Sequence, residues 1–311
     1  MPKIYSDILI NMATENPYFM IKSAEAKFNG EIRTVANKII SDQSIKIILL
    51  SGPSGSGKTT SANILKDMLN DSGKKTAVIS LDNYFKNKNN YPLNHDGKPD
   101  FESINALEID LLHESLSEIA KGNVTFIPKF DFINQTRIDN FEKINIGENG
   151  VVIIEGIHAL NPIISQNLPD DNVLKIFVSV STGIKDRNEH EIISGIDIRC
   201  LRRVIRDSIY RGFSFDKTLN IWDSVLDGEQ KWLYPFKSLA DVKINTFHSF
   251  EVFVYSKYLR DKMSDENLPT DNRFYDILKQ AAKMPQIDES LVPDNSLIRE
   301  FIPGGIYENI Y

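Results

Sequence analysis

A dense group of small and flexible residues directly follows an apolar run in this chain. Residues 49–65 read LLSGPSGSGKTTSANIL, and the segment from Gly52 to Thr59 matches the pattern G-x-x-x-x-G-K-[ST]. A loop that wraps around phosphate must turn its backbone N–H groups inward, and glycine adopts the necessary conformations at little cost. In such a loop the lysine reaches the terminal phosphates, and the hydroxyl that follows it binds Mg²⁺. The stretch therefore predicts a phosphate-binding loop.

The segments on both sides of the loop favour this interpretation over a chance match in a flexible loop. Residues 45–51 are typical of a buried strand, and residues 58–73 are typical of an amphipathic helix that ends at Gly73. The amino end of that helix would present free N–H groups and a positive dipole end to an anion. We expect the following residues to hold phosphate: Gly52, Ser54, Gly55, Ser56, Gly57, Lys58, Thr59 and Thr60.

Two acidic residues lie at the ends of apolar runs that predict strands. Asp82 ends the run 74–82, and Glu155 ends the run VVIIE. Ligands of parallel sheets bind at the carboxyl ends of the strands, so both carboxylates are expected beside the loop. There a carboxylate can hold Mg²⁺ or accept a proton from an attacking hydroxyl. The alternative for each is a carboxylate that caps a strand-to-loop turn.

Arginines crowd residues 198–212. The spacing i, i+3, i+4, i+7 places four of them on one helical face: Arg199, Arg202, Arg203 and Arg206. Like charges on one face repel, so this stripe needs anions against it, and phosphate groups are anions that suit arginine. The alternatives are a solvated basic face with partners such as Asp207 and, less in keeping with an acidic chain, a nucleic-acid-binding helix.

Further apolar runs alternate with helical patterns along the chain. Strands are expected at residues 45–51, 74–82, 149–156, 174–181 and 239–246, and further helices at 103–122 and 198–212. Buried strands separated by helices predict an α/β fold with a central parallel sheet and helices on both faces. We expect a helical lead-in over 1–44, a core over 45–246, and a mostly helical C-terminal extension over 247–311 with a polar stretch at 261–273.

Composition narrows the functional classes. The chain has 311 residues, of which 41% are hydrophobic, and a formal net charge of −7. We expect no membrane span and no secretory signal, because the apolar runs are short and the N-terminus lacks the pattern. The single cysteine, Cys200, excludes an intramolecular disulfide and fits a cytoplasmic protein. The acidic balance argues against broad binding of nucleic acid.

The motifs together resemble the phosphoribulokinase/uridine kinase family of P-loop kinases over roughly residues 45–246. The resemblance is carried by GPSGSGKTT, SLDNYF, DGKPDFESINALEIDLL, IPKFDFINQTR, VVIIEGIHALNP, RCLRRVIRDSIYRG and LADVKINT. The closing SLIREFIPGGIY resembles the C-terminal end of a bacterial-type, uridine kinase-like branch.

The resemblance implies a kinase that uses ATP and Mg²⁺ on a small hydroxyl compound. Asp82 would be the catalytic base, and the metal would be held by Thr59, Glu155 and Asp82. Lys58, Arg202 and Arg206 would act on the transferring phosphoryl group, and Arg203 would contact the nucleotide. Acceptor contacts would come from Phe85, Glu102, Phe130, Gln135, Arg137 and Arg199. The arginine helix would be a mobile lid, and assembly as a homo-oligomer is left open.

The chain departs from the uridine–cytidine kinases at the acceptor side. Phe130 and Gln135 stand where those kinases have Tyr and His, Glu102 stands for a ribose-binding Asp, Phe85 for a Tyr, and Phe213 for a lid Arg. Three functions stay open: a kinase of the 5′-hydroxyl of uridine or a relative, a kinase of another hydroxyl compound such as a sugar phosphate, and a catalytically idle nucleotide-binding protein. The intact phosphoryl-transfer residues argue against the third. The absence of an N-K-x-D motif argues against a GTPase.

Overall fold

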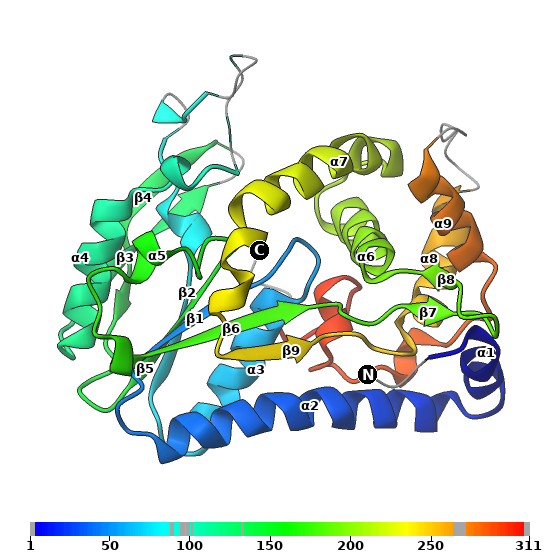
Figure 1. Ribbon diagram of the computed structural model, residues 1–311, viewed down its shortest axis with the longest axis horizontal. Coiled ribbons are helices and arrows are strands. Elements are labelled where there is room, and N and C mark those ends of the chain that lie inside the picture. The colour runs from blue at the N-terminus through cyan, green and yellow to red at the C-terminus, as the bar shows by residue number, and fades with distance from the viewer. Residues whose placement is uncertain are drawn as a thin grey trace.

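A five-stranded parallel sheet forms the centre of the molecule. The computed structural model describes residues 4–87, 90–93, 97, 100, 102–131, 134–263 and 272–307. The sheet has the strand order β2-β5-β1-β6-β9 (Figure 1). Its strands are β1 (Ile47–Ser51), β2 (Thr76–Ser80), β5 (Val151–Glu155), β6 (Val173–Ser179) and β9 (Val242–Asn245). Every pairing is parallel, which confirms the predicted sheet, and each strand matches a predicted one to within a few residues.

Alternate residues of the central strand enter two different hydrophobic clusters. Ile48 and Leu50 of β1 belong to one cluster, and Ile47 and Leu49 belong to the other. This follows from the period of two along a strand, which points successive side chains to opposite faces of the sheet. Both faces are therefore covered, as the unbroken apolar runs predict.

Helices cover both faces. One cluster contains residues of α2 (Pro17–Ser41), α3 (Lys58–Asp71), α6 (Gly195–Tyr210), α7 (Phe215–Trp232) and α8 (Glu251–Met263), and the other contains residues of α4 (Ile109–Ala120) and α5 (Pro162–Ser165). In Figure 1, α2 runs along the lower side of the view, and α6 and α7 lie on the upper side. The remaining long helices are α1 (Ser6–Glu15) and α9 (Arg273–Ala282). No helix of the described ranges is long and apolar enough to cross a membrane.

Both terminal segments pack on the same core. Phe28 of α2, Ile48 of β1, and Leu297 and Phe301 near the C-terminus belong to one hydrophobic cluster. The predicted lead-in is helical, and the C-terminal extension contains α8, α9 and short 3₁₀ turns. The boundaries at residues 44 and 246 stay a prediction. Most of the polar stretch at 261–273 lies outside the described residues.

Several elements were not predicted. They are α7, the hairpin of β3 (Thr125–Asp131) and β4 (Thr136–Ile144), and the short pair β7 (Ile184–Lys185) and β8 (Glu191–Ile193). The helix predicted at 103–122 is instead a 3₁₀ turn, Ile104–Ala106, followed by α4. The break has a clear cause, because Phe85 forms a β-bridge with Leu107 and the Glu108 N–H donates to the Tyr84 carbonyl. This pairing holds the segment after β2 against the start of α4.

Candidate active site

The phosphate-binding loop joins β1 to α3. Gly55 and Gly57 have φ angles of +70° and +82°, in the left-handed region that favours glycine. A Cβ on Gly55 would lie 2.8 Å from the carbonyl oxygen of Arg199, and one on Gly57 would lie 2.7 Å from the Leu297 side chain. Backbone conformation and close packing therefore both require the two glycines.

Two amides of this loop already bind carboxylates. The Ser54 N–H donates to Glu229 Oε1 at 2.8 Å, and the Thr60 N–H donates to Glu300 Oε2 at 3.1 Å. Both glutamates are buried. The loop therefore presents amide donors that hold anionic oxygens, as phosphate binding requires. Glu300 lies at the first turn of α3, so a phosphate that uses the Thr60 amide must displace it.

We expect Glu300→Gln to strengthen the binding of Mg·ATP by about threefold to tenfold. The substitution keeps a group that accepts from the Thr60 N–H but removes a negative charge that repels the phosphates at short range. Titration calorimetry measures the dissociation constant, and the exposed Glu142→Gln serves as a control for net charge. Unchanged or weaker binding in Glu300→Gln would contradict competition at this amide.

Lys58, Asp82 and Glu155 gather at one edge of the sheet. Lys58 begins α3, Asp82 follows β2 in the 3₁₀ turn Leu81–Tyr84, and Glu155 ends β5, which lies between β1 and β2. The Lys58 Nζ donates to the loop carbonyl of Pro53 at 3.1 Å. Desolvation raises the pKa of both carboxyls, and the positive charge of Lys58 acts against that rise in each, so the three groups interact electrostatically. The predicted convergence at the carboxyl ends of the strands is thus present.

Burial opposes the ionisation of both carboxyls. Desolvation raises the pKa of Glu155 to about 7, with Lys58 acting against it and the Asp82 charge adding to it. Desolvation also raises the pKa of Asp82, although its side chain is accessible to solvent. A cation that arrives beside them would favour the charged forms of both.

These residues fit Mg²⁺ only together with a nucleotide. The described part of the chain contains no group of three or more His, Cys, Asp or Glu side chains that could hold a metal. Magnesium commonly takes one or two protein carboxylates, with substrate phosphates and water completing its shell. The Thr59 hydroxyl with Glu155 and Asp82 suits that arrangement, and their role as ligands stays a prediction.

We expect Glu155→Gln to stabilise the ligand-free fold at pH 8 but not at pH 5. The pKa of Glu155 is raised in the folded state, so the folded protein binds the proton more tightly than the unfolded chain and loses stability as the pH rises from about 4.5 to about 7. The neutral glutamine removes that loss, which is about 1–3 kcal/mol at pH 8. Urea unfolding of both proteins at the two pH values measures it. An equal difference at pH 5 and pH 8 would contradict the raised pKa.

The arginine stripe of α6 faces the phosphate-binding loop. Arg199 and Arg202 are 2% and 0% exposed, which excludes a solvated basic face. Arg199 Nη1 donates to the Ser54 carbonyl at 3.0 Å and to both carboxylate oxygens of Glu229, at 2.7 and 2.9 Å. Arg202 donates to the Gly55 carbonyl at 3.1 Å and forms a 2.6 Å ion pair with Glu251. Carboxylates of α7 and α8 therefore compensate the two charges in the absence of any phosphate.

The other two arginines of the stripe share one buried carboxylate. Arg203 Nε lies 3.4 Å from Asp207, and Arg206 Nη2 lies 2.8 Å from it. Asp207 is fully buried, and the half-exposed Arg211 also lies 3.5 Å from it. Arg203 Nη1 donates to the Ser54 hydroxyl at 2.8 Å, which places its guanidinium on the loop. Contacts of the four arginines with phosphate or acceptor, and movement of α6 as a lid, stay predictions.

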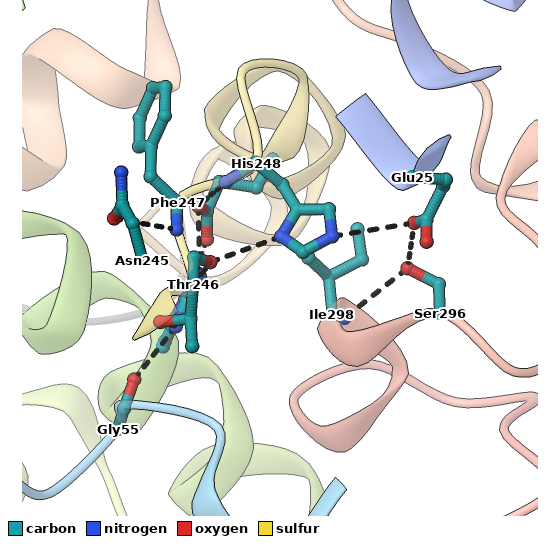
Figure 2. Close-up of polar contacts among 10 residues, drawn as sticks. Glu25, Gly55, Asn245, Thr246, Phe247, His248, Ser296 and Ile298 are labelled. Carbon is teal, nitrogen blue, oxygen red and sulfur yellow. Dashed lines mark hydrogen bonds and ion pairs between the residues drawn. The ribbon is translucent and has the colours of Figure 1, made fainter. Parts of the chain in front are cut away.

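A second layer of buried polar contacts ties the loop to both chain termini. Figure 2 shows Thr246 and His248 between Gly55 on one side and Glu25 and Ser296 on the other. The Thr246 carbonyl accepts from Arg202 at 2.6 Å and lies 3.1 Å from His248 Nδ1. His248 Nε2 lies 3.7 Å from the Glu25 carboxylate, to which the Ser296 hydroxyl also donates. The lead-in and the C-terminal segment therefore support the loop through the residues that connect β9 to α8 and through Arg202.

An aromatic cluster lies beside Asp82. The rings of Phe85 and Phe130 are 5.5 Å apart, and those of Phe85 and Tyr91 are 6.1 Å apart. Desolvation raises the pKa of Tyr91, and so does the charge of Asp82, which places the phenol near that carboxylate. The Asn83 side chain accepts from the Phe130 N–H at 3.2 Å and fixes the β3–β4 hairpin to the turn that carries Asp82.

The remaining predicted acceptor residues divide into two groups. Desolvation raises the pKa of Glu102 to about 7, and the charges of Arg203, Asp82 and Lys58 also act on it. Because these charges reach its carboxyl, Glu102 lies close to the reaction centre. Gln135 lies in the turn of the β3–β4 hairpin with a φ of +53°. Arg137 pairs with Glu108 at 3.2 Å and with Asp139 at 2.6 Å. Residues 132 and 133 of the same motif lie outside the described residues.

Three buried acidic residues of the site were missed in the sequence. Glu229, Glu251 and Glu300 all bind the loop or its arginines, across 30 to 240 residues of chain. Glutamate is seldom fully buried without a partner, but its burial cannot be read from local spacing. The available signal was indirect, because four arginines on one helical face require several carboxylates and Asp207 is only one.

A parallel sheet of this strand order, with a phosphate-binding loop after its central strand, is the fold of a P-loop kinase. The chain belongs to the Phosphoribulokinase / Uridine kinase family, whose model matches residues 47–252, so the resemblance seen in the sequence is confirmed. Uridine kinases of Staphylococcus haemolyticus (strain JCSC1435) and Staphylococcus aureus (strain JH9) are each 31% identical to it over 199 residues, which cover 64% of this chain and 86% of each relative. The solved structure of a possible uridine kinase from Bacillus stearothermophilus matches with a TM-score of 0.45 and 17% identity, over 70% of this chain and 99% of that one.

Proposed function

We propose that this chain transfers the terminal phosphoryl group of ATP to a hydroxyl of a nucleoside, with uridine or a close relative as the acceptor. The observation that carries the proposal is the position of Asp82. This carboxylate lies within electrostatic reach of Lys58 on one side and of the aromatic cluster of Phe85, Tyr91 and Phe130 on the other. Membership of the family and the 31% identity to proteins named uridine kinase support it.

Each side chain would have a distinct part in the reaction. Asp82 accepts the proton of the attacking hydroxyl, and Lys58 and Arg203 offset the negative charge of the phosphates. Mg²⁺, held by Thr59, Glu155 and Asp82, would neutralise charge that develops on the phosphate oxygens. Arg206 lies near enough to Asp207 to be held in one orientation, from which it would act on the transferring group.

The aromatic cluster favours a nucleoside over a sugar phosphate. Aromatic rings offer stacking and apolar contact to a base. A sugar phosphate instead needs a cation that binds the phosphate it already carries before the transfer. Both acceptor-side cations predicted in the sequence are already paired, Arg137 with two carboxylates and Arg199 with Glu229. Because Phe130 and Gln135 replace Tyr and His, we also propose that preference among bases differs from that of a uridine–cytidine kinase.

A comparison of acceptors tests this proposal. Purified protein is given Mg·ATP with uridine, cytidine, two purine nucleosides, or a pentose phosphate, and kcat/KM is measured for each with product identified by mass. We expect the highest value for a nucleoside. A pentose phosphate or another polyol that exceeds every nucleoside would contradict the proposal and favour a phosphoribulokinase-like activity. ATP binding without transfer to any acceptor would leave a nucleotide-binding protein.

A further inference from the structure

His158 is a buried polar residue that the reaction described above does not use. It follows Glu155, the last residue of β5, by three positions, and the residue is only 3% exposed. Neither ring nitrogen has a hydrogen-bond partner in the part of the chain that the structure describes. An unpaired polar group in a protein interior costs free energy, so its retention calls for a ligand or a structural cause.

The ring is held in place without using its nitrogens. Its edge meets the Trp232 ring, with centroids 6.3 Å apart and planes at 75°. The backbone is fixed as well, because the Ser51 hydroxyl donates to the Ile157 carbonyl at 2.8 Å and the Asn161 N–H donates to the His158 carbonyl at 2.8 Å. The imidazole is therefore oriented, although neither nitrogen makes a side-chain hydrogen bond of regular geometry to the described residues.

The surroundings of His158 lead to the reaction centre. Desolvation lowers its pKa to about 4, while an interaction with the Glu102 backbone and the charge of Asp100 act in the opposite direction. The imidazole is thus neutral near pH 7, with one donor and one acceptor nitrogen. Glu102 in turn feels the charges of Asp82 and Lys58. His158 therefore lies near the Glu102 backbone, and the Glu102 carboxyl lies near Asp82 and Lys58.

We propose that His158 is a specificity-determining residue that hydrogen-bonds a ribose hydroxyl of the acceptor, next to the hydroxyl that Glu102 accepts. A hydroxyl both donates and accepts, as a neutral imidazole does, and a neighbouring carboxylate accepts from the second hydroxyl of a vicinal diol. The base is left to the aromatic cluster beside Asp82. This inference rests on the proposed nucleoside kinase activity and adds to it a residue that reads the sugar.

The test combines a protein variant with a change in the acceptor. In His158→Leu, which keeps a similar volume and removes both nitrogens, we expect the KM for uridine to rise about tenfold while the KM for ATP is unchanged. For the deoxyuridine, 2′ or 3′, that lacks the contacted hydroxyl, the same substitution should change KM by twofold or less. His158→Gln, which keeps a donor and an acceptor, should restore part of the affinity for uridine.

Folding and a second histidine provide the controls. Leucine leaves no polar group unpaired, so the urea midpoint of His158→Leu should equal or exceed that of the parent. His113→Leu alters a histidine of α4 that binds the Ile163 carbonyl at 2.7 Å and should leave the KM for uridine unchanged. If His158→Leu fails to fold, the ratio of KM values for uridine and the deoxyuridines in His158→Gln decides instead.

Two different results would overturn the inference. Equal KM changes for uridine and both deoxyuridines, or none, in an active parent would make His158 structural and leave the nucleoside kinase activity intact. A parent that phosphorylates none of these nucleosides would overturn the proposed function, and the role of His158 with it.

Discussion

Asp82→Asn lowers kcat by about 10²–10⁴-fold if Asp82 takes the proton of the acceptor hydroxyl. The amide has nearly the same size as the carboxylate but cannot accept that proton. Its effect on the fold should be small, because the side chain is accessible to solvent. Steady-state kinetics with saturating ATP and acceptor measures kcat, and calorimetry checks that ATP affinity changes much less.

A matched variant separates catalysis from a general effect of charge. Asp170 is exposed in the 3₁₀ turn that precedes β6, at the opposite end of the strands from the loop. Asp170→Asn should keep the turnover of the parent. If Asp82→Asn retains turnover within a few-fold of the parent, Asp82 only caps the turn after β2, and its assignment as base is wrong.

Lys58→Ala abolishes measurable turnover or reduces it by at least about 10²–10³-fold, the loss expected for one preorganised charged group. The charge of Lys58 favours the ionised forms of both Asp82 and Glu155, against the desolvation that raises their pKa values. Its removal therefore also raises both of those pKa values further and weakens the binding of Mg·ATP. The fold should persist, because Lys58 is half-buried and, among the described residues, its ammonium makes one hydrogen bond, to the Pro53 carbonyl.

Lys66→Ala is the control for this variant. Lys66 lies two turns further along α3, and its ammonium bonds Asn63 at 2.9 Å. The Lys66→Ala variant removes the same charge from the same helix without changing the loop. Its kcat and its affinity for ATP should therefore match those of the parent. Unchanged ATP affinity and turnover in Lys58→Ala, measured by calorimetry and a coupled assay, would show that phosphates bind elsewhere.

The parts of the site that depend on local pattern were predictable from the sequence. The loop between Gly52 and Thr59 needs glycine at positive φ, and the structure has positive φ at Gly55 and Gly57. Asp82 and Glu155 follow apolar runs that are strands, and parallel strands bring their carboxyl ends to one edge. Each inference used residues only a few positions apart.

The partners of the arginines were not predictable in the same way. Helical spacing correctly places Arg199 and Arg202 on one face, but it does not show that Glu229 of α7 and Glu251 of α8 lie opposite them. Those contacts depend on how α6, α7 and α8 pack. The sequence predicts contacts of this stripe with phosphate, which stay a prediction. The structure shows that Arg199 and Arg202 form buried ion pairs and also donate to the carbonyls of Ser54 and Gly55.

The β3–β4 hairpin was missed for a related reason. Most of β4 is exposed, so it lacks the apolar alternation by which a half-buried strand is identified. Its position is set by side chains of the segment after β2, where Asn83 accepts from the Phe130 N–H and Asn87 accepts from the Arg137 N–H. Tyr91 packs with Phe85 and Phe130 in the aromatic cluster beside Asp82, and no sequence motif had marked it.

Transfer of a labelled phosphate from ATP to uridine tests directly whether this protein is a nucleoside kinase. The parent protein is given Mg²⁺, uridine, and ATP with an isotopic label in its terminal phosphate, and the labelled products are separated. We expect labelled uridine 5′-monophosphate from the parent and about 10²-fold less from Asp82→Asn. Label that appears only as inorganic phosphate, or on an added sugar phosphate but on no nucleoside, would contradict it.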